Sequence, residues 1–209
     1  MHLAINTRRS FVIPETVKQI DFFAFSQTKI ESIVLHDNIE YLGTYTFANN
    51  ILLKTVHIGK NLQTMGENPF LYCSGVENIT IHKENKYFKL ENKVLIDVVR
   101  NIFVTYLITK EDEKYTVPDG IVEISYYAFY QNSHVKEISI PSSVTLIEPL
   151  GLGNLPNLQV VNYYGKKNPS CNSYGMMETP TSVIINVPSN YVGDTFCTRK
   201  VTNKNLPAA

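Results

Sequence analysis

Apolar residues recur along most of this chain in units of 23 residues. Counted from the leading apolar residue of a unit, positions 1, 4, 6, 10, 13 and 18 are apolar, and most positions between them are polar. A fixed period of about 20–50 residues is typical of a solenoid, in which each repeat packs on its neighbours. Two consecutive units carry the set as Ile30, Ile33, Leu35, Ile39, Leu42 and Phe47, then Leu53, Val56, Ile58, Leu62, Met65 and Phe70.

The period predicts a single repeat domain over residues 1–209. The rhythm holds from 30 to 75 and again from 112 to 157, and it is interrupted between these stretches. We place the repeats at about 8–29, 30–52, 53–75, 76–111, 112–134, 135–157 and 158–180, followed by a C-terminal cap at 181–201 and a frayed tail at 202–209.

Positions 3 to 6 of each unit alternate between polar and apolar residues, which indicates a strand with one buried face. We expect one short strand per unit, joined in a parallel sheet, with positions 4 and 6 in the core. An aromatic residue at position 18 should fill each turn, as at Phe47, Phe70 and Phe129. Positions 3 and 5 should project outward as two rows: Ser32, Val34, Thr55, His57, Asn78, Thr80, Lys114, Thr116, Glu137, Ser139, Val160 and Asn162.

The repeat resembles the BspA-type leucine-rich repeat. Its pattern, L-x-x-I-x-I-P-x-x-V-x-x-I-G-x-x-A-F-x-x-C/N, is matched at Ile138–Pro141 and from Val117 to Ala128–Phe129. The resemblance implies a strand-dominated solenoid of the α/β type. It would be a right-handed superhelix with a parallel sheet on its concave face and a few short helical or 3-10 turns on its convex face. The family comprises surface antigens and adhesins of bacteria and protozoan parasites, which implies adhesion or the binding of a host or extracellular-matrix protein.

An insertion breaks the rhythm in the fourth unit, where the next regular unit begins only at Asp112. Two β-rich runs, Val94–Val99 and Ile102–Leu107, flank the polar pair Arg100–Asn101, which predicts a hairpin. We expect a decoration packed on the solenoid, so that Lys86–Thr109 can be removed without unfolding the chain. A second recognition surface is the alternative.

Both ends of the chain leave alternatives open. About seven residues precede the first unit, and fraying, a fragment boundary or end-to-end pairing would each fit, so the oligomeric state stays open. Gly165–Pro180 loses the period and reads as a loop. Of the three cysteines, Cys73 at position 21 is expected to be buried and to satisfy backbone groups of its turn. A bridge between Cys171 and Cys197 is left open.

Composition and motifs give no reason to expect catalysis. The formal net charge is zero, which offers no attraction for nucleic acid or an anionic membrane. No run of about 18 apolar residues predicts a membrane span. No nucleotide-binding loop, nucleophile elbow or paired C-x-x-C motif occurs, so we expect no enzyme and no cofactor. The opening residues lack the pattern of a signal peptide, so the protein is cytoplasmic, leaves the cell by another route, or has a trimmed sequence. The resemblance favours the cell surface or secretion.

Three histidines of successive units suggest a metal site as one hypothesis. His36, His57 and His82 would project from neighbouring rungs about 4.8 Å apart, and imidazoles bind zinc. No cysteine or carboxylate shares their row, so we favour a solvated row of polar side chains and expect no metal. Asn78–Thr80 is also a glycosylation sequon, but it lies in a predicted strand.

The function predicted from these features is a non-enzymatic module that presents a sheet face to a protein or peptide partner. An intracellular scaffold of the same fold is the alternative, and an enzyme comes third. We expect the partner to centre near His57 and Thr80, with Tyr164 as an aromatic anchor. Alternatively, Tyr164 packs on the loop Gly165–Pro180. The candidate partner-binding residues are Ser32, Val34, Thr55, His57, Asn78, Thr80 and Tyr164.

Overall fold

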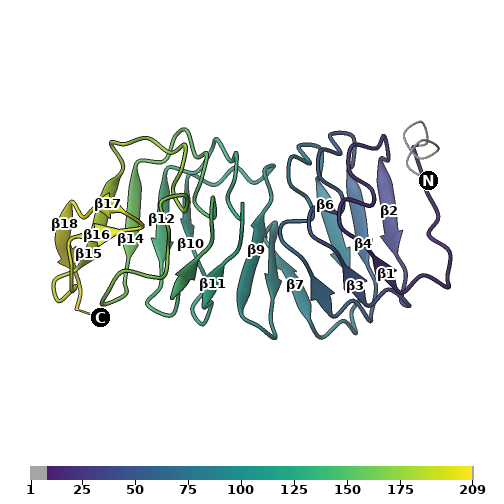
Figure 1. The fold of residues 1–209 in the computed structure, drawn as a ribbon, viewed down its shortest axis with the longest axis horizontal. Coiled ribbons are helices and arrows are strands. Elements are labelled where there is room, and N and C mark those ends of the chain that lie inside the picture. Colours follow the sequence, from purple (N-terminus) through teal and green to yellow (C-terminus); the bar gives the residue numbers. More distant parts are fainter. Residues whose placement is uncertain (1–8, 209) are drawn as a thin grey trace. The chain divides into compact units, whose positions relative to one another are not determined.

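The repeats fold into short parallel strands joined by turns (Figure 1). The computed structural model describes residues 9–208. The chain divides into two compact units. The first takes in the described residues up to Arg100 together with Val104–Thr109, and the second takes in Asn101–Phe103 and the residues from Lys110 onward. The single domain over the whole chain stays a prediction.

The first unit contains the predicted parallel strands in the predicted register. Ile33, Val56 and Ile79 are partners across three strands, and all three side chains are buried. The 23-residue period therefore fixes which residues pair. A second parallel sheet, which the sequence pattern did not predict, forms from two-residue strands around position 13. The first sheet comprises β2 (Ser32–Leu35), β4 (Thr55–Ile58) and β6 (Asn78–Ile81), and the second comprises β1 (Gln19–Ile20), β3 (Tyr41–Leu42) and β5 (Thr64–Met65).

The second unit repeats this plan with a longer sheet. Ile138 and Val161 are partners and both are fully buried, as positions 4 of their repeats should be. The main sheet comprises β10 (Lys114–Thr116), β12 (Glu137–Ile140), β14 (Val160–Tyr163), β15 (Ile184–Pro188) and β18 (Asn203–Leu206), all parallel. The other sheet pairs Ile102–Phe103 with β11 (Glu123–Ile124), and β11 with β13 (Leu146–Ile147).

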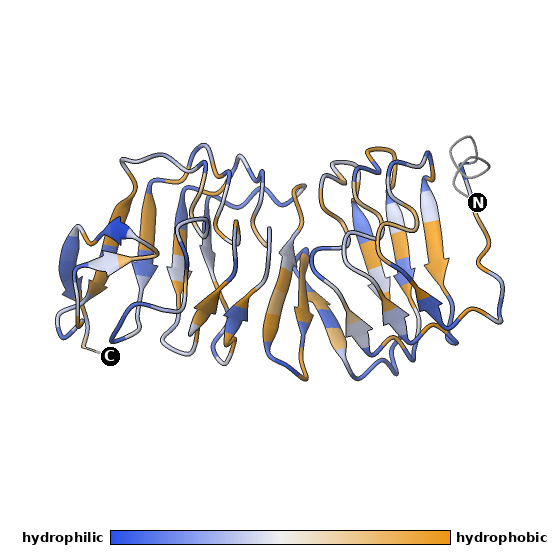
Figure 2. Cartoon of the chain, in the orientation of Figure 1, coloured by the Kyte–Doolittle hydropathy of each residue, from blue (hydrophilic) through white to orange (hydrophobic). Residues whose placement is uncertain are grey.

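The core is built from the apolar positions of the repeat, and aromatic rings run through it. In the first unit, Phe25, Phe47 and Phe70 form a stack with ring centroids 5.6 and 5.8 Å apart. Phe47 and Phe129 are fully buried and Phe70 is 5% exposed, which confirms the prediction for position 18. Hydrophobic and hydrophilic residues alternate along β4 and β6 (Figure 2), as expected of strands with one buried face.

The segments that link the two sheets of a unit are tight turns, and residues 9–208 contain no helix or 3-10 turn, so the short helical turns expected there are absent from this range. Phe23, Tyr45 and Tyr127 adopt left-handed backbone conformations with φ of 54–56° at equivalent places. Alternate N–H groups bond within the turn and to the next turn, as Ala24 and Phe25 do. In a helix, all these N–H groups would bond to carbonyls of the same segment. Because half of them bond to the next turn instead, the segments form turns rather than helices.

Position 21 satisfies backbone groups of the turns, as predicted. Asn50 donates from Nδ2 to the carbonyls of Phe25 and Phe47, both at 2.6 Å, and its Oδ1 accepts the Thr28 N–H. The thiol of Cys73 donates to Phe47 at 3.0 Å. Burial raises the pKa of the Cys73 thiol to about 12, so this cysteine is inert rather than reactive.

The insertion has one strand more than predicted. The expected strands correspond to β8 (Val94–Asp97) and β9 (Ile102–Tyr106), which are neighbours in the sheet. β7 (Phe88–Glu91), which was not expected, pairs antiparallel with β8. Asn92 and Lys93 join these two strands with φ of 48° and 61°, as a type I′ hairpin turn requires.

The expectation that Lys86–Thr109 is a removable decoration is wrong for β9. Phe103 is fully buried, and its ring stacks on Phe129 with centroids 4.8 Å apart. Ile102 and Phe103 also supply the strand that pairs with β11. This segment therefore takes the place of a position-13 strand and belongs to the core of the second unit.

The C-terminal region is more regular than its composition suggests. Gly165–Pro180 is not a free loop, because its carbonyls accept N–H groups of the preceding turn, as Tyr174 does from Leu150 at 2.9 Å. Asn203–Leu206, expected as part of a frayed tail, forms β18 and pairs with β15. Between β15 and β18 lies the small antiparallel pair β16 (Thr195–Phe196) and β17 (Arg199–Lys200). Cys171 and Cys197, left open from sequence, are joined by a disulfide with Cα atoms 5.0 Å apart.

Candidate functional site

Six of the seven candidate residues lie together on the outward face of β2, β4 and β6. Pairing in register produces two straight rows across the three strands, and neighbouring strands are about 4.8 Å apart. Five of these side chains are exposed, His57 is half-buried, and the Val34 side chain is 56% exposed. The rows are Ser32, Thr55 and Asn78, and then Val34, His57 and Thr80.

Few polar groups on this face are used within the chain. Nδ1 of His57 lies 2.9 Å from Oγ1 of Thr80. The side chains of Ser32, Thr55 and Asn78 make no hydrogen bond to another residue in the described range 9–208. Hydroxyl and amide groups exposed on a rigid strand can therefore bond to a partner without first giving up an internal bond.

Ion pairs between successive turns border this face. Arg9 pairs with Glu31 at 2.7 Å, and Lys60 pairs with Glu84 at 2.6 Å. The hydrogen bond and the charge of Lys60 lower the pKa of the Glu84 carboxyl, and Glu84 in return raises the pKa of Lys60. All four side chains are exposed to solvent, and such pairs contribute little to stability because water screens them.

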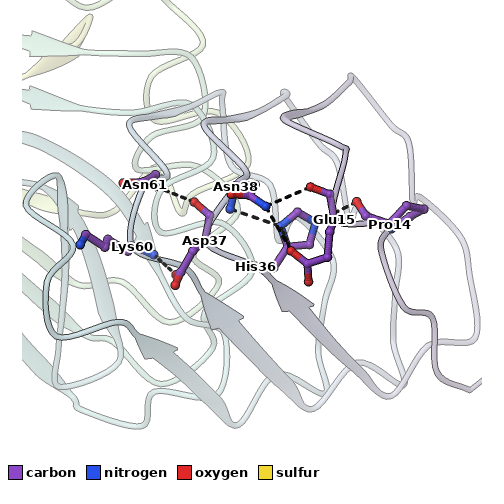
Figure 3. Close-up of polar contacts among 7 residues, drawn as sticks. All are labelled: Pro14, Glu15, His36, Asp37, Asn38, Lys60 and Asn61. Carbon is purple, nitrogen blue, oxygen red and sulfur yellow. Dashed lines mark hydrogen bonds and ion pairs between the residues drawn. The ribbon is translucent and has the colours of Figure 1, made fainter.

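Polar side chains fasten the corners that follow these strands (Figure 3). Asn38 donates from Nδ2 to the carbonyl of Glu15 at 3.0 Å, and Asp37 accepts the Lys60 N–H at 2.7 Å. Nε2 of His36 lies 3.1 Å from the carbonyl of Pro14. Each contact joins one turn to the next. We call His36, Asp37 and Asn38 with these partners the corner row, and it holds the spacing of the strands that carry the candidate residues.

The three histidines do not form a metal site. The His36 side chain is only 10% exposed and is held in the corner row, so it does not lie in an outward row as expected. His57 contacts Thr80, and Nδ1 of His82 accepts the N–H of Glu84 at 3.2 Å. Residues 9–208 contain no group of three or more histidines, cysteines or carboxylates arranged to hold a metal ion.

The outward face of the second unit differs, because its polar groups bond to one another. Asn203 donates to Asn186, and Asn186 donates to Asn162, both at 2.8 Å. Asn162 donates in turn to Glu137 at 2.9 Å, and Glu137 pairs with Lys114 at 2.8 Å. We call this chain of contacts the amide row. The groups of the amide row already have partners inside the protein, so β14, β15 and β18 offer fewer free groups to a ligand than β2, β4 and β6 do.

A family profile decides the identity of the repeat. The profile of the BspA type leucine rich repeat region matches in six copies, over residues 5–94 and 105–191. The chain belongs to the BspA-type leucine-rich repeat family. The profile describes a repeat, and it brings no catalytic family with it. No curated protein matches the chain.

Solved structures with the same fold come from bacterial leucine-rich repeat proteins. They agree with a strand-dominated solenoid of about seven turns. A leucine-rich repeat protein from Eubacterium ventriosum has 20% identity and a TM-score of 0.60, and the matched region covers 92% of this chain and 65% of the Eubacterium protein. A leucine-rich cell surface protein from Faecalibacterium prausnitzii has 17% identity and a TM-score of 0.54, with coverage of 91% and 51%. The pneumococcal vaccine antigen PcpA has 18% identity and a TM-score of 0.53, with coverage of 92% and 71%.

The chain thus spans between 51% and 71% of the length of these three proteins. At such identities the likeness shows the fold and nothing about the ligand. Residues 9–208 contain no helix of the length and hydrophobicity needed to cross a membrane.

Tyr164, the seventh candidate, belongs to the second unit of this BspA-type chain. It follows β14, and its N–H donates to Ile140 at 2.9 Å. Tyr164 lines a cavity of about 390 Å³ together with Thr116, Asp119, Ser139, Pro141 and Ser142. Whether Tyr164 serves the same partner as His57 stays a prediction, because the two residues lie in separate units.

The sequence reasoning missed one exposed aromatic group in the BspA-type turns. The rings of Phe22 and Phe23 lie 4.3 Å apart, and Phe23 lies 5.4 Å from Tyr45. Phe22 is 56% exposed. The signal was the pair of aromatic residues just before the buried Phe25, in turns where one aromatic position suffices for the core.

Proposed function

We propose that this chain is a non-enzymatic binding module that engages a protein or peptide through the outward face of β2, β4 and β6. The observation that carries the proposal is the contrast between the two units. The first unit exposes Ser32, Thr55 and Asn78 without internal hydrogen bonds in the described range, whereas the second unit closes its amide row. A partner gains most where the protein has left donors and acceptors unused.

The composition of this face suits binding by a rigid surface. Serine, threonine and valine lose little rotamer freedom when covered, so few rotatable bonds are frozen on association. Val34 offers an apolar contact among polar neighbours. Strand pairing and the corner row hold the face in place before the partner arrives, which lowers the cost of binding further.

Adhesion to a host or extracellular-matrix protein is the biological form of this proposal. It is supported by the family and by likeness to a pneumococcal vaccine antigen and to a cell surface protein. This support is an analogy at the level of the fold. The partner contacts proposed here rest on the geometry of the face.

Catalysis at this face is not part of the proposal, although a histidine lies beside a hydroxyl group there. A nucleophile and base are usually completed by a third group that orients the base. Nε2 of His57 has no hydrogen-bond partner among residues 9–208. The pair therefore resembles a cross-strand contact more than a catalytic dyad.

The proposal is tested with two threonines of the same repeat. Thr55 lies in β4 on the proposed face, and Thr64 lies in β5 on the other sheet, and both are exposed. The immobilised chain is presented with purified collagen, fibronectin and laminin, and with surface proteins from cultured cells identified by mass spectrometry. We expect Thr55→Glu to abolish capture of the bound protein and Thr64→Glu to leave it unchanged, with equal melting temperatures. Equal capture by both variants would exclude this face.

A further inference from the structure

The cavity beside Tyr164 has the chemistry of a cation site. The residues that line it are one acidic residue, Asp119, one aromatic residue, Tyr164, three hydroxyl-bearing residues, Thr116, Ser139 and Ser142, and Pro141. No lysine or arginine lines it. Its volume of about 390 Å³ falls within the range of ligand pockets, roughly 300–1,000 Å³. We propose that this cavity binds the guanidinium group of an arginine side chain from a peptide or protein.

The sheet explains why these hydroxyl groups remain available. Thr116, Ser139, Asn162, Asn186 and Asn203 follow one another in register across the five strands of the main sheet. The amide row runs through the last three of these residues and turns aside to Glu137. The cavity opens where the asparagines stop. Ser139 accepts only a long contact of 3.4 Å from Asn162, and its backbone carbonyl is bonded to Val117 at 2.9 Å.

The polar side chains that line the cavity match the donors of a guanidinium group. Arginine carries five N–H donors in a fixed plane and no acceptor. Every polar side chain in the lining can accept a hydrogen bond, and the carboxylate can accept two in parallel. The side chains of Thr116, Asp119 and Tyr164 have no hydrogen-bond partner within the described range. Asp119 and Thr116 are exposed, so a side chain from outside can reach them.

The aromatic wall distinguishes a cation from a neutral ligand. Tyrosine attracts a cation over its ring face, and guanidinium groups stack on such rings more often than ammonium groups do. Tyr164 stands where most repeats have proline or glycine, including Pro118 and Pro141 in this unit. A proline there would give neither a ring face nor a phenol. The carboxylate and the ring together favour a planar cation over a sugar, which needs no ionised group.

This site goes beyond the proposed function, because it lies in the second unit and shares no residue with the face of β2, β4 and β6. Each can fail while the other holds. The Thr55→Glu experiment tests the first unit alone, and the small probe used below tests the cavity alone.

The probe is N-acetyl-arginine amide, titrated to millimolar concentrations into the ¹⁵N-labelled chain and followed by NMR. N-acetyl-citrulline amide is the matched control, because it has nearly the same shape without the charge. We expect arginine to shift the amide signals of Thr116, Asp119 and Tyr164, and citrulline to leave them in place. Asp119→Asn should weaken binding about tenfold or more, and Tyr164→Leu about three- to tenfold.

Asp194→Asn supplies the matched control variant, since Asp194 is an exposed aspartate of the same unit outside the cavity. It should bind the probe like the parent chain, and all variants should keep the parent melting temperature. Absence of shifts in the parent chain overturns the proposal, as do equal shifts from citrulline or equal weakening by Asp194→Asn. Shifts produced by glucose or N-acetylglucosamine, but not by arginine, would assign the cavity to a sugar instead.

Discussion

Nδ1 of His57 lies 2.9 Å from Oγ1 of Thr80, directly across the strand pair β4–β6. The contact joins two candidate residues and is a cross-strand pair of the kind that contributes about 0.2–1 kcal/mol. A double-mutant cycle with His57→Ala and Thr80→Ala should give a coupling energy in that range. The cycle for Thr55 and Asn78, which are also partners but share no side-chain hydrogen bond, should give less. If the Thr55–Asn78 cycle gave an equally large coupling energy, the hydrogen bond between His57 and Thr80 would add nothing to the strand pairing.

Phe70→Ala should reduce the free energy of unfolding by about 3–5 kcal/mol, since it removes a buried ring from the stack and leaves a cavity. Phe22→Ala provides the comparison, because that ring is 56% exposed, and it should cost less than about 1 kcal/mol. Urea denaturation measures both. A Phe70→Ala variant as stable as the parent chain would contradict the burial described for the stack.

Phe103→Ala should destabilise the second unit by about 3–5 kcal/mol, because the ring is fully buried against Phe129. Val99→Ala, in the exposed loop after β8, should change the free energy of unfolding by about 0.5 kcal/mol or less. If the two substitutions cost the same, β9 would be a decoration after all. Hydrogen exchange of the amides of β11 locates the effect in the second unit.

Reduction of the disulfide between Cys171 and Cys197 should lower the free energy of unfolding by about 3–4 kcal/mol, since the bridge closes a loop with a sequence separation of 26. Thermal melting with and without dithiothreitol measures the change. The Cys171→Ser/Cys197→Ser chain should melt at the same lower temperature and should not respond to the reductant. Cys73 should stay unmodified by iodoacetamide in the folded chain, because burial keeps it as the thiol.

The free energy of unfolding should fall as the pH rises from about 10 to about 12. Burial raises the pKa of Tyr163 to about 12, and burial together with Tyr163 raises that of Tyr191 to about 12. An unfolded tyrosine ionises near pH 10, so in this window the unfolded chain releases protons that the folded chain retains. Tyr163→Phe, which loses the bond to the Val144 carbonyl, should show a smaller fall. Denaturation at several pH values with absorbance at 295 nm follows both effects.

The constant period made the main sheet predictable. Ser32, Thr55 and Asn78 were assigned to one row because they are 23 residues apart, and strand pairing puts them in register. The second sheet was not predicted, because strands of two residues are too short to show an alternation. β7 was missed for a related reason, since only Phe88 in it is buried.

The candidate site was predictable as a set of positions and not as a set of contacts. Periodicity assigned Thr80 and His57 to the outward rows, but the bond between them depends on side-chain rotamers. Asn203 was assigned to a frayed tail because its segment lies at the end of the chain, and its pairing with β15 follows only from the path of the chain after the repeats end. The repeat period also did not predict that Asp119 and Tyr164 line one cavity, because that depends on how the chain folds between the strands.

The disulfide also determines how the C-terminal end would respond to a pulling force. A solenoid under tension is expected to unwind from its end, one strand at a time, because each turn is held only by its neighbours. β18 would peel away from β15 first, followed by the β16–β17 pair. Unwinding would then stop at Cys197, because its bond to Cys171 carries the load past β15. The chain between Cys171 and Cys197 could otherwise extend by roughly 90 Å. The disulfide therefore keeps this segment from being stretched until the bond is reduced.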